Sequence, residues 1–135
     1  MDPNNMRIET QLALFLDNRP GMLASVCDAL REANINIYAL TVSDTVDHSV
    51  IRLIVSDTRK ALLLFEERGT LVVESEVLLL EAAKSPGVLA EISHTLAKNG
   101  LNIEYCYGTA PVQSDKGLLV LRSSDAKKAL QVLSS

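Results

Sequence analysis

Apolar and polar residues along the first half of the chain follow periods of two and of about 3.6 residues in turn. Alternating, β-compatible runs predict strands, whereas apolar side chains at three- and four-residue steps predict amphipathic helices. Asp57 is a good N-cap for the second helix, and Gly69 is expected to end it. The expected order is strand, helix, strand, strand, helix and strand, over residues 8–16, 23–33, 35–45, 49–55, 58–68 and 71–75.

The second half of the chain repeats the first at a constant offset of 66 residues. The repeat predicts a strand over 77–82, a helix over 87–99 and strands over 101–108 and 117–121. A final helix is expected after Asp125, where the offset becomes 68 because the second hairpin is two residues longer. Residues identical between the copies are Pro20 and Pro86, Gly21 and Gly87, Leu23 and Leu89, Ala24 and Ala90, Leu30 and Leu96, Asn36 and Asn102, and Ile37 and Ile103.

This order of elements predicts two α+β modules of the ferredoxin-like βαββαβ type, over residues 7–75 and 76–135. In each, two helices would cover one face of an antiparallel sheet. Because Ser135 aligns with Glu67, the second module should lack its last strand. We expect a three-stranded sheet with an open edge, or an edge covered by another chain, and we favour assembly.

Charge and hydropathy exclude several classes of protein. The net charge is −4, the pI is about 5.1 and Lys and Arg do not cluster, which argues against nucleic-acid binding. No apolar run reaches the roughly 18 residues of a membrane span. Residues 1–5 are polar and lack the apolar centre of a signal peptide, so a cytoplasmic location is expected.

Candidate catalytic and metal-binding side chains are few and scattered. Cys27 and Cys106 show no CxxC spacing, and a structural role is favoured for Cys27 over redox or metal chemistry. His48 and His94 have no Ser, Cys or Asp partner in a recognisable arrangement. We therefore expect no catalytic residue, no metal and no cofactor. The remaining polar and aromatic candidates have ordinary structural explanations as well. Asp44, Asp47 and Asp115 are expected to form turns, and Tyr38, Tyr105 and Tyr107 to lie on the sheet or between the modules.

The most informative stretch is the turn at residues 18–23, Asn-Arg-Pro-Gly-Met-Leu, which returns as Lys-Ser-Pro-Gly-Val-Leu at 84–89. Proline fixes one φ and glycine lets the backbone turn or approach a ligand closely. The free amides at the start of the following helix favour a carboxylate. Asn18-x-Pro20-Gly21-x-Leu23, with Asn36 sixteen residues beyond the proline, resembles the ACT domain, a small-molecule-binding regulatory module. The second copy resembles another ACT domain.

This resemblance implies an amino-acid ligand held where two modules lie with their second strands adjacent. One site would join Asn18, Gly21, Met22 and Leu23 to Asn102, and its mirror would join Gly87, Val88 and Leu89 to Asn36. The two sites are not equal. Lys84 replaces Asn18, and Leu16 and Ala82 occupy a place that is polar in some relatives. The first site is therefore expected to be the better one.

Two functions remain open at this stage. The first is a non-catalytic regulatory protein that binds an amino acid, forms a homodimer and acts on a partner enzyme. The alternative is a structural or protein-interaction module without ligand, because Asn-x-Pro-Gly is also ordinary turn chemistry and the two asparagines could satisfy strand-end backbone groups. The sequence lacks the phosphate loop that an acylphosphatase needs. It also lacks the aromatic residues on the third strand that an RNA-recognition domain needs.

Overall fold

The computed structural model describes residues 5–44 and 46–135, so Thr45 of the expected hairpin and the first four residues lie outside it. The chain divides into two compact units. The N-unit is Thr10–Ser75, and the C-unit is Glu76–Ser135 together with the start of the first strand. The elements are β1 (Met6–Asp17), α1 (Met22–Glu32), β2 (Ile37–Asp44), β3 (His48–Val55), α2 (Thr58–Glu67), β4 (Leu71–Ala83), α3 (Val88–Lys98), β5 (Ile103–Thr109), β6 (Lys116–Ser123) and α4 (Ala126–Ser134).

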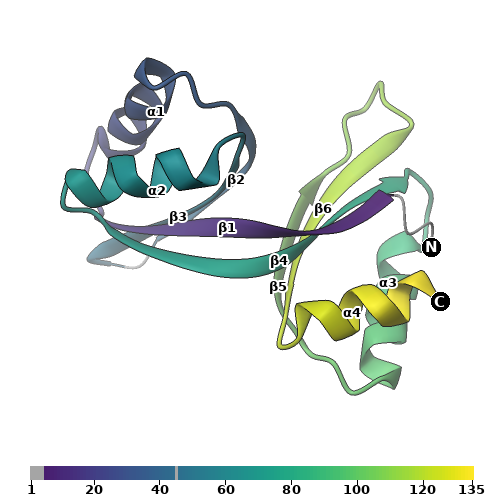
Figure 1. Ribbon diagram of the computed structural model, residues 1–135. Helices are drawn as coiled ribbons and strands as arrows, with labels where there is room; N and C mark the ends of the chain where they lie inside the picture. The colour runs from purple at the N-terminus through teal and green to yellow at the C-terminus, as the bar shows by residue number, and fades with distance from the viewer. Residues whose placement is uncertain (1–4, 45) are drawn as a thin grey trace. The chain divides into compact units, whose positions relative to one another are not determined.

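In the N-unit the strand order is β2-β3-β1-β4, which is the order of a ferredoxin-like βαββαβ module. β1 runs antiparallel to β3, with Leu12 opposite Leu53 and Leu14 opposite Ile51. Figure 1 shows α1 and α2 on the same side of these strands. Because alternate strand residues face the helices, one apolar core forms there. It contains Leu12, Leu14, Val26, Ala29, Leu30, Ile35, Ile51, Leu53, Val55, Ala61 and Phe65.

The C-unit repeats this arrangement with the strand order β1-β4-β6-β5. β4 pairs antiparallel with β6, placing Leu78 opposite Leu121 and Leu80 opposite Leu119. The helices α3 and α4 contribute Ile92, Leu96, Ala129 and Leu133 to the core beneath them. The predicted fold, two ferredoxin-like modules with helices on one face of each sheet, is confirmed.

The fourth strand of the C-unit is supplied by the start of β1. As predicted, no strand follows α4 in the described chain. The outer edge of β4 is therefore neither open nor left for another chain to cover. Residues 6–9 belong to the C-unit, and β1 is the neighbour of β4. Met6 is only 6% exposed and lies in the same core as Leu78 and Leu80, with Ile8 packed against it. By sequence residues 7–9 open the first repeat, whereas by packing they complete the second unit.

The ends of the helices follow the expected local chemistry. Asp57 and Asp125 each accept a hydrogen bond from the backbone three residues later, at 3.1 Å to the amides of Lys60 and Lys128. Asn34 and Gly69 have φ angles of 58° and 76°, the left-handed conformation that ends helices. The expected strands over 71–75 and 77–82 are continuous in β4.

Candidate functional site

The two turn–helix junctions have the same backbone conformation. Gly21 and Gly87 are the N-caps of α1 and α3, with φ angles of 89° and 90°. A side chain at such a φ is strained, which explains the glycine in both copies. The first helical hydrogen bonds run from Ser25 to Gly21 at 3.0 Å and from Glu91 to Gly87 at 2.9 Å. The amides between them have no partner within the helix.

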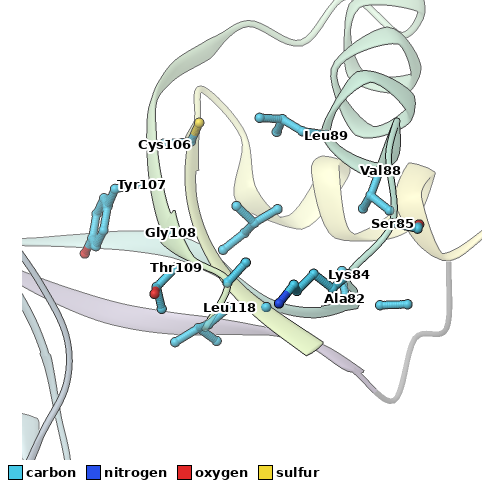
Figure 2. A pocket seen from close by; sticks show the side chains of 14 residues that line it. Ala82, Lys84, Ser85, Val88, Leu89, Cys106, Tyr107, Gly108, Thr109 and Leu118 are labelled. Atoms are coloured by element: carbon cyan, nitrogen blue, oxygen red, sulfur yellow. The ribbon is translucent and has the colours of Figure 1, made fainter. Parts of the chain in front are cut away.

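A cavity of about 440 Å³ lies beside the second junction, wholly within the C-unit. We call it the β5 cavity. Its walls come from the end of β4 and the following turn, the first turn of α3, and the strands β5 and β6, as Figure 2 shows. The lining residues are Ala82, Ala83, Lys84, Ser85, Val88, Leu89, Cys106, Tyr107, Gly108, Thr109, Ala110, Gly117, Leu118 and Leu119.

One positive charge lies at the wall of the β5 cavity. The Lys84 side chain extends from the turn toward Thr109 in Figure 2, and its ammonium donates to the carbonyls of Pro111 at 2.7 Å and Val112 at 2.9 Å. Among the described residues, no carboxylate forms an ion pair with this ammonium. Lys84 is the one Lys, Arg, Asp or Glu among the described lining residues.

Gly108 keeps the floor of this cavity open. It lies opposite Leu119 in the pairing of β5 with β6. A Cβ atom at residue 108 would lie 2.5 Å from the carbonyl oxygen of Leu118 and 2.6 Å from Cδ2 of Leu119. The backbone oxygen cannot move aside without disturbing the strand, so only glycine fits here.

The equivalent positions of the N-unit carry larger side chains. At the repeat offset Leu16 corresponds to Ala82, Leu40 to Cys106 and Val42 to Gly108. The cavity next to Gly21, of about 390 Å³, contains no β2 residue. It is lined by helix residues and Arg68, whose Nη2 donates to Ser25 Oγ at 3.4 Å. The apolar cavity described above borders the second junction, and the expected preference for the first junction stays a prediction.

The structure places the predicted first-site residues around α1. Asn18, exposed in the turn, donates its backbone N–H to the carbonyl of Asp47 at 3.3 Å. Gly21 caps α1, and Met22 and Leu23 form its first turn. Leu23 is 41% exposed, because α1 turns the side that carries Val26, Ala29 and Leu30 toward the core.

The predicted second-site residues are divided between two places. Val88 and Leu89 line the β5 cavity, with Leu89 46% exposed, whereas Gly87 contributes only the cap. Asn36 lies at the other end of α1, where its backbone N–H and C=O pair with the hydroxyl and the amide of Ser56, both at 2.9 Å. Asn102 is exposed just before β5. Joining each junction to the asparagine of the other repeat stays a prediction.

Sequence reasoning missed most of the β5 cavity. Cys106, Tyr107 and Thr109 were not assigned to the site, nor was Gly108. A signal was present, because the repeat offset pairs Gly108 with a valine and Ala82 with a leucine. Smaller residues on β4 and β5, the two strands that pair with β6, indicate missing volume.

The two histidine candidates differ in position, because His48 lies opposite Asp17, next to the first junction, whereas His94 lies on α3. His48 and His94 are exposed. Within residues 5–44 and 46–135, no three His, Cys, Asp or Glu side chains gather as metal ligands. None of the helices in that part of the chain has the length and hydropathy of a membrane span.

Comparisons with known proteins identify the family. The chain matches the model of the ACT domain pair over residues 6–135. It is 32% identical to protein BT0572 from Bacteroides thetaiotaomicron, covering 96% of this chain and 88% of that one with a TM-score of 0.88. A comparison with curated proteins found no match.

More distant structures share the fold. The ligand-free regulatory subunit of aspartate kinase from Thermus thermophilus is 19% identical with a TM-score of 0.69, covering 95% of this chain and 94% of that one. The corresponding subunit from Thermus flavus is 19% identical with a TM-score of 0.66, covering 96% and 94%. The repeated Pro-Gly junctions, the two ferredoxin-like units and the match over residues 6–135 agree: the chain belongs to the ACT domain pair family.

Proposed function

We propose that this protein is a non-catalytic regulatory protein that binds an amino acid at its turn–helix junctions. The observation that carries this proposal is the β5 cavity, about 440 Å³ in volume and bordered by the first turn of α3. That volume falls within the range of about 300–1,000 Å³ typical of small-molecule sites. The free amides of the helix start would take the carboxylate.

The proposed ligand contacts include both junctions. At the first, Gly21, Met22 and Leu23 would approach the ligand with Asn18 beside them, and at the second Gly87, Val88 and Leu89 would do so. In a homodimer, a module of the second copy would add Asn102 to the first site and Asn36 to the second. β2 and β5 are edge strands of their units, with one side of the backbone left for pairing.

Regulation requires a partner, which we propose to be a cytoplasmic enzyme. The Thermus structures with this fold are regulatory subunits of aspartate kinase. By analogy, ligand binding here would change a partner's activity only if the ligand binds two arrangements of the complex with different affinity. No catalytic residue and no cofactor enter this proposal.

A thermal-shift screen of the twenty amino acids tests the proposal, with Asn18→Ala and Asn102→Ala alongside. A ligand that binds only the folded protein raises the melting temperature by mass action. We expect a rise with one or a few amino acids and a smaller rise in the variants. A flat response to all twenty at millimolar concentration would contradict amino-acid binding.

A ligand-free interaction module is the second candidate. The apolar side chains of Leu23, Leu40 and Val42 in the N-unit are exposed, which favours a protein surface over a small ligand there. Capture of the same enzyme subunit with and without every amino acid would support this candidate. A complex that forms only with an amino acid would exclude it.

A further inference from the structure

We propose that the β5 cavity binds a small carboxylate with an uncharged, branched apolar body, held entirely within the C-unit. This inference deepens the proposed function and rests on it for the regulatory meaning of binding. It differs in the ligand's chemistry and in the residues that hold it, because the walls come from one unit and from one copy of the chain.

The shape of the cavity sets the apolar part of the ligand. Ala82, Val88 and Leu89 form one side, and Leu118 and Leu119 of β6 form another. These walls offer a ligand methyl groups and no charge. Burying an apolar body of four or five carbons against them is favourable at about 0.8 kcal/mol per CH₂ group, whereas a charged side chain would lose its water there.

Lys84 sets the anionic part of the ligand. An ammonium has three donors, and two of them are used by the neutral carbonyls of Pro111 and Val112. The third donor and the uncompensated charge remain available at the cavity wall. Since none of the described lining residues is acidic, an anion is the ligand charge that balances this site.

A ligand's amino group would find no carboxylate among the described lining residues. An α-amino acid could place its ammonium on neutral acceptors such as Thr109 Oγ1, whereas the corresponding 2-oxo acid needs no such acceptor. The shared chemistry is therefore a short branched carboxylate. Whether the source is the amino acid or the 2-oxo acid is decided by experiment.

The N-unit provides an internal comparison. Its residues Leu16, Leu40 and Val42 stand where the C-unit has Ala82, Cys106 and Gly108. Because each of these residues is larger than its C-unit counterpart, we expect one such ligand per chain. Substituting the N-unit residue at the C-unit position should then close the β5 cavity.

The experiment is a titration of the ¹⁵N-labelled chain followed by amide chemical shifts. The probes are L-leucine, 4-methyl-2-oxopentanoate, L-leucinamide, L-aspartate and L-lysine. We expect at least one of the first two to perturb amides in residues 84–89 and 106–109 and to leave 18–23 and 40–43 unchanged. L-Leucinamide lacks the carboxylate and should bind at least tenfold more weakly.

Paired variants assign the binding to this cavity. Lys84→Met should weaken carboxylate binding about tenfold, whereas Lys98→Met on the exposed end of α3 should not. Ala82→Leu and, independently, Cys106→Leu should weaken it more than tenfold by filling the cavity. Ala97→Leu, the same change on an exposed part of α3, is the control for folding and surface effects.

The outcomes separate this inference from the proposed function. Binding of 4-methyl-2-oxopentanoate with no amino acid bound would support the inference and overturn the amino-acid function. Aspartate or lysine perturbing residues 18–23, with no carboxylate perturbing 84–89, would support the function and overturn the inference. Unchanged binding in both filling variants, or equal binding of leucine and leucinamide, would also overturn the inference.

Discussion

The two turn–helix junctions share a backbone and differ in what surrounds it. Gly21 and Gly87 have φ angles within a degree of each other, 89° and 90°. Beside the first, β2 carries Leu40 and Val42, and beside the second, β5 carries Cys106 and Gly108. Duplication thus kept the turn while the neighbouring strand changed, and the lining of the cavity beside the junction differs as well. Backbone conformation alone does not make a binding site.

The units also differ in how their sheets are completed. The N-unit takes its fourth strand from the first part of β4, directly after α2. The C-unit takes its fourth strand from the start of β1, more than a hundred residues earlier than α4. Stability of the C-unit therefore depends on the beginning of the chain, which local sequence in the second repeat cannot provide.

The largest expected effect tests that dependence. Met6→Asp places a carboxylate in the C-unit core beside Leu78 and Leu80 and should lower the free energy of unfolding by about 3 kcal/mol or more. Urea denaturation followed by circular dichroism measures the loss. Met6→Leu keeps the apolar volume and should cost less than about 1.5 kcal/mol. Equal losses in the two variants would contradict a buried position for residue 6.

Gly108→Ala is the next test, because it gives β5 a side chain at the position where β2 of the N-unit carries Val42. The added Cβ would meet the Leu118 carbonyl oxygen at 2.5 Å, so we expect a loss of about 1–3 kcal/mol from overpacking. Val42→Ala at the equivalent N-unit position is partly exposed and should change stability by about 0.5 kcal/mol or less. Thermal unfolding of both variants compares them, and similar melting temperatures would refute the steric role of Gly108.

The second helix of each unit, α2 and α4, begins in the same way in the two units. Asp57 and Asp125 accept from the third following amide at the same distance, 3.1 Å. Asp57→Ala and Asp125→Ala should each cost about 1 kcal/mol, and the Asn variants much less because asparagine also caps helices. Chemical denaturation measures the set. A loss at only one of the two caps would show that the repeats differ here as well.

Local features of the fold followed from the sequence because they depend on few neighbouring residues. Asp57 as a cap, Gly69 as a stop and the two Pro-Gly turns were predicted at the residues where they occur. The start of β1 completing the C-unit was not, since strand pairing between distant segments leaves no local pattern at Met6. The repeat offset alone indicated that the second helix of each unit begins in the same way.

Only part of the candidate site followed from the sequence, for a related reason. The turn was identified from its own chemistry, and Val88 and Leu89 were identified from the resemblance to the ACT domain. The opposite wall needs the register of β5 on β6, which places Gly108 against Leu119.

The smallest expected effect concerns two lysines that join different segments in the two units. Lys84 Nζ binds the hairpin carbonyls of Pro111 and Val112, whereas Lys60 Nζ binds the carbonyl of Ala33 at 2.6 Å, at the end of α1. These ammonium groups are exposed, so Lys84→Met and Lys60→Met should each change global stability by less than about 1 kcal/mol.

The effect of each lysine variant should instead be local and confined to its own unit. Amide hydrogen exchange should speed up around Ser114 and Lys116 in Lys84→Met, and around Asn34 and Ile35 in Lys60→Met, because each loses a bond that holds that loop. Exchange that rises in both loops in either variant would show that the units unfold together. Exchange confined to one loop would mean that the hairpin beside the β5 cavity can open without the N-unit, which is the freedom that a ligand on Lys84 would remove.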